Sequence, residues 1–280
     1  MGNICIFSSI NLNGSKKIKV INDENYFKNV TIVSTIGSGK FGEVFEVYDS
    51  KIKSKIALKK VENNNYQTQA ELSYMKYLKD KSIIKCHQII TDSKFTYFLL
   101  DLYNCDLFSY FENNILLFKN EKFIKIIIKN ILKPLLYLKS NKLVHLDIKP
   151  ENYLVKNDCL DLVLTDLSTI KSLDKCKISS TKLYYLENSC GTLNYAAPEI
   201  FINRYSEKSD IFSLGQIIYM FYTKNFLPCY KSELFNKSDK IIKESDMPTK
   251  VKTFILKCRK IHVKDRFSYN DIQRSKWLYD

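Results

Sequence analysis

The sequence has little of what a metal-binding, secreted or membrane-spanning protein would contain. It has only three histidines, and its eight cysteines include no C-x-x-C pair, which argues against a zinc site. Scattered single cysteines are typical of buried thiols in a reducing compartment. The most apolar stretch, residues 123–138, is interrupted by Lys125, Lys129 and Lys133, so no membrane-spanning helix is predicted. The N-terminus also lacks the basic flank and long apolar core of a secretory signal, so an intracellular protein, cytoplasmic or nuclear, is expected.

The charge balance is strongly basic, with 44 lysine and arginine residues against 30 aspartate and glutamate residues. One interpretation of this excess is a nucleic-acid or other polyanion partner. The other is a compositional bias, because the basic residues are nearly all lysines and are spread along the chain among many asparagines and isoleucines. The sequence has no arginine cluster and no RNP-type aromatic motif, which favours the second interpretation. Nucleic acid is therefore not the expected partner.

The apolar pattern predicts strands in the first part of the chain and helices in the rest. Extended segments are predicted at residues 30–33, 44–48, 55–61, 89–90 and 95–100. Helices are predicted at residues 66–78, 107–111, 120–141, 211–221 and 251–258, with Pro134 expected to kink the third. This order predicts an α+β protein in two lobes. Polar, aperiodic residues 1–28 are predicted to be an extension, followed by one domain at 29–280 with its N-lobe at about 29–101 and its C-lobe at about 102–280.

A glycine-rich segment, G-S-G-K-F-G at residues 37–42, lies between two predicted strands. A dinucleotide-binding fingerprint would need a strand followed by a helix, so this segment does not fit that class. A glycine loop between two strands is the arrangement that covers nucleotide phosphates in the protein-kinase pattern. Lys59 follows in I-A-L-K, a match to the strand motif V-A-I-K, and Glu71 on the next predicted helix is its expected acidic partner.

The segment H-L-D-I-K-P-E-N at residues 145–152 brings a carboxylate, a cation and an amide close together in the sequence. Phosphoryl transfer to a hydroxyl needs a base to orient the hydroxyl, positive charge near the γ-phosphate and oxygen ligands for magnesium. Asp147, Lys149 and Asn152 supply these groups, and Asp166 in the later segment L-T-D-L-S adds a second magnesium ligand.

Three further segments complete the pattern: G-T-L-N-Y-A-A-P-E at 191–199, K-S-D-I-F-S-L-G at 208–215 and K-D-R-F at 264–267. In this order, and over about residues 30–280, the segments resemble those of the eukaryotic protein kinase family. The resemblance implies a bilobal protein kinase fold, with an antiparallel β-sheet N-lobe that carries one helix and a mainly helical C-lobe. It also implies an ATP-dependent enzyme that uses Mg²⁺ and acts on protein substrates.

The resemblance assigns roles to individual residues. Asp147 would be the catalytic base, Lys149 would neutralise charge on the transferred phosphoryl group, and Asn152 and Asp166 would hold magnesium. Lys149, together with a threonine in the G-T pair, is the arrangement of serine/threonine kinases. The implied structural residues are Glu199 and Arg266, which would form a buried ion pair, and Asp210, which would tie the catalytic-loop backbone to the central helix.

The resemblance also implies an ATP-binding set. Lys59 would contact the α- and β-phosphates, Leu100 would be the gatekeeper, and Asp106 would bind a ribose hydroxyl. The backbone of residues 101–103 would bind adenine. The full implied set is Gly37, Ser38, Gly39, Gly42, Val44, Ala57, Lys59, Glu71, Leu100, Asp101, Tyr103 and Asp106.

Two departures from the family pattern, at Ser168 and Leu146, and a milder one at Leu167 keep an alternative open, a pseudokinase scaffold that binds nucleotide or partners without turnover. Ser168 replaces the glycine of D-F-G and would restrain the backbone at Asp166 if that residue needs a positive φ. Leu167 replaces phenylalanine, one apolar residue for another. Leu146 replaces the arginine of H-R-D, which normally binds an activation-loop phosphate, so control by activation-segment phosphorylation is not expected.

Within the family the subgroup and substrate assignments stay open. The segments N-Y-L-V and R-Y-S-E-K-S-D-I are similar to those of calcium-dependent protein kinases, whereas G-T-L-N-Y-A-A-P-E is as similar to dual-specificity spindle-checkpoint kinases. No D-x-D-x-D-G loop occurs, so the sequence predicts no calcium-binding site of its own. Glu151 and Asp106 lie where similar kinases receive basic residues upstream of the phosphoacceptor. The alternative is that Glu151 is only a solvated loop residue.

The N-terminal M-G-N-I-C raises the prospect of acylation. Gly2 is the residue that myristoylation requires once Met1 is removed, and Cys5 would accept a second, thioester-linked chain. The motif M-G-x-x-x-[ST] is only partly met, because residue 6 is isoleucine. Peripheral membrane association through Gly2 and Cys5 is therefore one expectation, and an unmodified N-terminus is the other.

Overall fold

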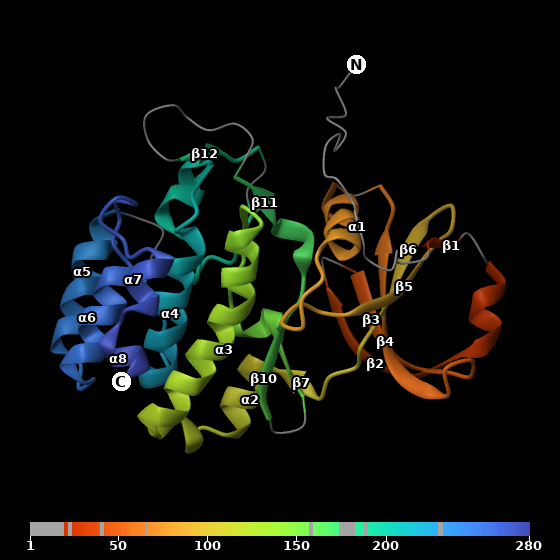
Figure 1. Ribbon diagram of the computed structural model, residues 1–280, viewed down its shortest axis with the longest axis horizontal. Coiled ribbons are helices and arrows are strands. Elements are labelled where there is room, and N and C mark those ends of the chain that lie inside the picture. The colour runs from red at the N-terminus through yellow and green to blue at the C-terminus, as the bar shows by residue number, and fades with distance from the viewer. Residues whose placement is uncertain are drawn as a thin grey trace. The chain divides into compact units, whose positions relative to one another are not determined.

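Figure 1 shows the computed structural model of the chain, which describes residues 20–21, 24–39, 42–64, 66–156, 159–173, 183–187, 190–228 and 232–280. The chain divides into two compact units. Of the described residues, one unit contains those up to Val61 together with Cys86–Leu100, and the other contains those within 62–85 and 101–280.

The first unit is built on a six-stranded sheet in the order β1-β5-β6-β4-β3-β2. The strands are β1 (Val20–Ile21), β2 (Val30–Gly39), β3 (Gly42–Asp49), β4 (Ser54–Glu62), β5 (Cys86–Thr91) and β6 (Phe95–Leu100). Pairing is antiparallel between β2 and β3, β3 and β4, and β5 and β6, whereas β1 runs parallel to β5. All the strands predicted from the sequence are present, and they enclose a small core of Val47, Ile56, Leu58, Ile90 and Leu99.

The N-terminal part of this sheet differs from the sequence prediction. Within the predicted extension, Val20 and Ile21 form strand β1, in register with Ile89 and Ile90, and Glu24–Asn29 forms the 3₁₀ helix η1. A strand of two residues is too short to show an alternating pattern, so sequence periodicity could not reveal it. Regular structure therefore starts ahead of residue 29.

The second unit is mainly helical. Its helices are α1 (Tyr66–Tyr77), α2 (Leu107–Asn113), α3 (Glu121–Ser140), α4 (Ser209–Thr223), α5 (Ser232–Glu244), α6 (Thr249–Cys258), α7 (Tyr269–Gln273) and α8 (Lys276–Tyr279), with 3₁₀ helices η2 (Leu117–Lys119), η3 (Pro150–Asn152), η4 (Leu167–Thr169) and η5 (Pro198–Ile202). Short strands form three small sheets: β7 (Cys105–Asp106), β9 (Tyr153–Lys156) and β10 (Cys159–Leu164); β8 (Leu143–Val144) and β11 (Lys171–Ser172); β12 (Tyr184–Tyr185) and β13 (Arg204–Tyr205). The predicted α+β class, with strands first and helices after, is confirmed. Among the described residues, no helix combines the length and hydropathy that crossing a membrane requires.

Helix α1 lies within this second unit. The segment that follows it is hydrogen-bonded to β10: the backbone N–H of Ile84 donates to the carbonyl of Leu164, and the N–H of Leu164 donates to the carbonyl of Ser82. Helix α1 also packs against η4. These bonds anchor the helix beside the segment that contains Asp166.

Helices α3 and α4 form the core of the second unit (Figure 1). Asn120 caps α3 by accepting hydrogen bonds from the backbone of Lys122 and Phe123, and the helix continues past Pro134 to Ser140. Helix α4 is buried along most of its length. A Cβ at its Gly215 would lie 2.9 Å from the Cβ of Cys258 on α6, so glycine allows α4 and α6 to approach closely.

Candidate active site

The loop between β8 and β9, residues 145–152, is fixed by a buried carboxylate on the first turn of α4. The backbone N–H groups of His145 and Leu146 each donate to a different oxygen of Asp210 at 2.8 Å. Burial raises the pKa of Asp210 above its ordinary value, although these two bonds and the charge of His145 favour the ionised form. Asp210 thus ties the backbone of this loop to helix α4.

Asp147 lies at the centre of a closed polar network, and only 4% of it is exposed. The Thr192 hydroxyl donates to its Oδ1 at 2.7 Å, and the Lys149 ammonium lies 3.0 Å from its Oδ2. Lys149 also donates to the Thr192 hydroxyl at 2.8 Å. The Asn152 amide nitrogen donates to the Asp147 carbonyl at 2.8 Å and to its Oδ2 at 3.2 Å. The structure therefore brings together the carboxylate, ammonium and amide that the sequence singled out.

Asp166 is held next to this loop through the residue before it. The Thr165 N–H donates to the carbonyl of Asn152 at 2.9 Å, and the His145 ring Nε2 lies 3.3 Å from the carbonyl of Thr165. Asp166 itself has a left-handed backbone, with φ of 56°, and Ser168 lies in the short helix η4 that follows. The positive φ therefore falls on Asp166 and not on Ser168, so a serine fits where the family pattern has glycine.

The oxygen atoms of Asn152 and Asp166 suit a magnesium ion that arrives with a nucleotide. The hydrogen bonds of Asn152 to Asp147 use only its amide nitrogen, which leaves the amide oxygen available as a ligand. Magnesium in phosphate-transferring sites is held by one or two protein oxygens together with phosphates and water. Within the described ranges no group of three or more His, Cys, Asp or Glu side chains could hold a metal ion.

In the first unit, the glycine-rich segment is the tip of the β2–β3 hairpin, where Gly39 pairs with Gly42. Gly42 has a φ of 114°, and a Cβ there would collide with the Lys60 carbonyl, so only glycine fits. A Cβ at Gly37 or Gly39 would meet open space, and Ser38 between them is exposed. Residues 40–41 lie outside the described residues. The phosphate-covering role of this hairpin stays a prediction.

The other predicted ATP-binding residues are placed on regular elements. Lys59 on β4 is buried and lies opposite Val44 on β3, and Ala57 on the same strand is also buried. Leu100 ends β6, and Asp101 and Tyr103 lie in the segment before β7. Glu71 is buried on α1 in the second unit. Its pairing with Lys59 stays a prediction.

Two carboxylates near the loop of residues 145–152 have surroundings that the sequence did not reveal. Asp106 caps α2: its two oxygens accept hydrogen bonds of 2.8 Å from the backbone and hydroxyl of Ser109. Its ribose-binding role stays a prediction beside this capping role. Glu151 on η3 has an exposed side chain, yet partial desolvation and the nearby charges of Asp106 and Asp147 raise its pKa. Asp106 and Glu151 are thus close enough to interact electrostatically.

A second buried carboxylate anchors the end of the G-T-L-N-Y-A-A-P-E segment. The guanidinium of Arg266 donates to both oxygens of Glu199, at 2.7 and 2.8 Å, and the Ser209 hydroxyl donates to Glu199 at 2.7 Å. Burial alone would raise the pKa of Glu199, but the charge and hydrogen bonds of Arg266 and Ser209 hold it below its ordinary value. Glu199 is therefore ionised and fixed at neutral pH.

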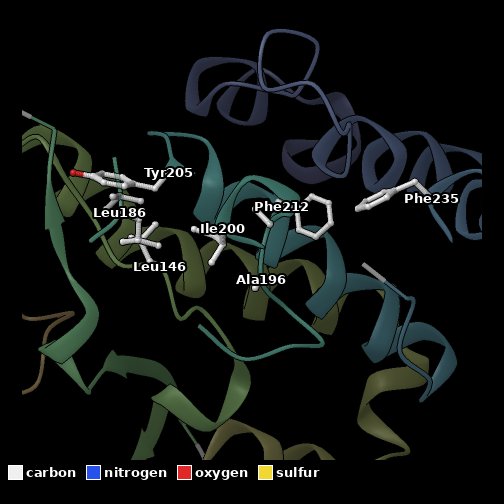
Figure 2. Packing of buried hydrophobic residues seen from close by; sticks show 9 residues of the cluster. Leu146, Leu186, Ala196, Ile200, Tyr205, Phe212 and Phe235 are labelled. Carbon is white, nitrogen blue, oxygen red and sulfur yellow. The ribbon is translucent and has the colours of Figure 1, made fainter. Parts of the chain in front are cut away.

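Leu146 has a role that sequence reasoning missed. It is buried in an apolar cluster with Leu186, Ala196, Ile200 and Tyr205 (Figure 2). The sequence indicated only that this residue cannot bind phosphate, whereas the structure gives it apolar partners before, within and after the G-T-L-N-Y-A-A-P-E segment. Its apolar character was the one available signal. Gly2 and Cys5 lie outside the described residues, so their acylation stays a prediction.

Comparison with known proteins matches the sequence to one family. The family model described as "Protein kinase domain" matches residues 30–278. The chain is 32% identical over 222 residues to calcium-dependent protein kinase 6 of Plasmodium berghei, covering 75% of this chain and 14% of that protein. It is 27% identical over 293 residues to serine/threonine-protein kinase cds1 of Schizosaccharomyces pombe, covering 95% of this chain and 61% of that protein. It is also 27% identical over 207 residues to the carbon catabolite-derepressing protein kinase of Saccharomyces cerevisiae, covering 71% and 31%. The chain thus spans less than two thirds of the length of these relatives.

Proposed function

The chain belongs to the protein kinase family, and we propose that it is an active enzyme that transfers the γ-phosphate of ATP to serine and threonine hydroxyls of protein substrates. One observation carries the proposal: Asp147 is a buried carboxylate that already accepts a hydrogen bond from a hydroxyl, with an ammonium at 3.0 Å. A phosphoacceptor hydroxyl must make the same kind of bond to the base that orients it.

Each polar group of the loop has a task in this reaction. Asp147 would orient the substrate hydroxyl and accept its proton, while Lys149, held by Thr192, would place positive charge beside the transferred phosphoryl group. Magnesium, when bound with ATP, neutralises charge on the phosphates. The side-chain oxygens of Asn152 and Asp166 would hold the ion. The tie to Asp210 keeps the loop backbone fixed during these steps.

The serine/threonine specificity has two supports. Lys149 and Thr192 are in direct contact, which is the arrangement that the sequence resemblance associates with serine/threonine kinases. The relative from Schizosaccharomyces pombe also bears the name serine/threonine-protein kinase. A pseudokinase would keep the fold and the nucleotide but lack turnover, so a turnover assay separates the two.

The test is phosphotransfer from radiolabelled ATP to generic basic proteins, with Mg²⁺ present and absent. Asp147→Asn removes the base at nearly constant shape and should lower turnover by about 100-fold or more. Asp246→Asn makes the same chemical change on a residue outside the loop and should leave turnover unchanged. Nucleotide binding without turnover in the unaltered chain would establish the pseudokinase alternative. Near-native turnover by Asp147→Asn would refute the assignment of the base.

We further propose a substrate preference and a location. The two electrostatically coupled carboxylates, Asp106 and Glu151, support substrates with Arg or Lys upstream of the phosphoacceptor. An acylated N-terminus at Gly2 and Cys5 would attach the enzyme to a membrane, because one myristoyl chain binds only marginally and a second chain makes attachment stable. An unmodified N-terminus would leave it in the cytoplasm or nucleus.

A further inference from the structure

Ser168 makes a contact that the glycine of the family pattern cannot make. Its hydroxyl donates to Oδ1 of Asp166 at 2.7 Å. The serine is only 3% exposed and lies inside the 3₁₀ turn η4. A short bond to an ionised carboxylate is among the stronger hydrogen bonds in proteins. This contact therefore acts directly on the carboxylate that the proposed mechanism assigns to magnesium.

The backbone of Asp166 explains why such a contact matters. Its left-handed conformation, with φ of 56° and ψ of 71°, is one that aspartate tolerates better than most residues because its short polar side chain can bond locally. As the residue before η4 it could cap that turn, but its side chain makes no capping bond to the turn's backbone. The bond to Ser168 is a local interaction that holds the carboxylate over the turn instead.

We propose that Ser168 is a positioning residue for the metal site: its hydroxyl fixes the side-chain orientation of Asp166 and thereby raises the affinity for magnesium bound with nucleotide. The inference rests on the proposed function in one respect, namely that Asp166 is a magnesium ligand. A carboxylate already held in one orientation loses less side-chain entropy when it binds the ion.

The same turn offers a matched control. The hydroxyl of Thr169 is also buried, and it has no hydrogen-bond partner among the described residues. Thr169→Val removes this hydroxyl at nearly constant volume and leaves Asp166 untouched. If buried hydroxyls in η4 act only on the stability of the turn, Ser168→Ala and Thr169→Val should have similar consequences. If Ser168 positions Asp166, only its replacement should change the dependence on metal.

The experiment is a magnesium titration of the full chain at a fixed concentration of a non-hydrolysable ATP analogue, with the rise in thermal midpoint as the measure of binding. Ser168→Ala should raise the half-saturating magnesium concentration about five- to tenfold, within the range that one hydrogen bond contributes. Ser168→Gly, which restores the family residue, should do the same, and Ser168→Thr, which keeps the hydroxyl, should restore the original value. Thr169→Val should titrate like the unaltered chain.

A parallel phosphotransfer assay separates positioning from general damage. With Ser168→Ala, turnover at saturating magnesium should stay within about twofold of the original, because the hydrogen bond acts on metal binding and not on the base. An unchanged or lowered half-saturating concentration in the alanine and glycine variants would overturn the inference. If the unaltered chain binds the analogue with magnesium but lacks turnover, the proposed function fails while the titration still decides the role of Ser168. If the unaltered chain binds no analogue at all, the proposed function and the proposed role of Ser168 are both overturned.

Discussion

Replacing Glu199 by glutamine should destabilise the second unit by about 3 kcal/mol, the lower end of the cost of breaking a buried ion pair. Both partners are almost fully buried, and the substitution leaves the guanidinium of Arg266 facing an amide that cannot match its two donors. The cost stays at the lower end because Arg266 keeps bonds of 3.0 Å to the carbonyls of Lys260 and Lys208.

Urea denaturation followed by tryptophan fluorescence measures this cost. The only tryptophan, Trp277, is buried in the second unit with its ring centroid 4.7 Å from that of Phe254, so it reports on the unit that contains the ion pair. With a slope of about 3 kcal/mol per molar urea, the midpoint should fall by about 1 M at pH 7. Glu244→Gln, which breaks the exposed pair with Lys240, is the control and should shift the midpoint by less than about 0.2 M.

The pKa shift of Glu199 also predicts how the destabilisation by Glu199→Gln depends on pH. Because the pKa of Glu199 is lower in the folded protein than its ordinary value of 4.5, its ionised form stabilises the fold above that pH, and this stabilisation is lost as pH falls through the lower, folded pKa. The difference between the original chain and Glu199→Gln should therefore be full at pH 7 and shrink below pH 4.5. A midpoint shift at pH 7 no larger than that of Glu244→Gln would refute this reasoning.

Three further predictions concern regulation, substrates and location. Because Leu146 is packed in an apolar cluster and cannot bind phosphate, phosphatase treatment should leave phosphotransfer within about twofold, and a large loss would contradict this interpretation. A peptide array should show a preference for Arg or Lys upstream of the phosphoacceptor that weakens in Glu151→Gln; a preference for acidic or proline-directed peptides would exclude it. Gly2→Ala should abolish membrane association and Cys5→Ser should leave weak, reversible binding, unless intact-mass analysis shows that Gly2 is unmodified in all molecules.

The sequence predicted most of the fold because its elements carry local signals. Helix α3, with its asparagine cap and its lysines spaced along one face, and the strands around the glycine hairpin have the periodicities that their positions require. Strand β1 could not be predicted, because two residues hold no period and its partner Ile89 is far along the chain. The grouping of α1 with the helical unit likewise depends on backbone bonds to Leu164 that no local pattern encodes.

Part of the candidate site could likewise be predicted from the sequence, and part could not. Asp147, Lys149 and Asn152 lie within one short loop, so their proximity follows from the sequence alone. The contact of Ser168 with Asp166 depends on the left-handed backbone of Asp166. The sequence showed only that a positive φ at this residue would matter, and not that the backbone adopts one. The sequence did not predict that Asp106 caps α2, because the family resemblance assigned this carboxylate to a ribose hydroxyl.

The apolar cluster around Leu146 also has a consequence for how the packing of this residue should depend on temperature and salt. Association of apolar side chains has almost no enthalpy near room temperature and a large heat-capacity change, so it weakens on cooling and is nearly indifferent to ionic strength. A contact between arginine and a phosphorylated side chain would behave in the opposite way, since salt screens charges. The strength of the apolar packing between Leu146 and Leu186 therefore depends on temperature (Figure 2). Cold, not salt, is the condition that should loosen this contact first.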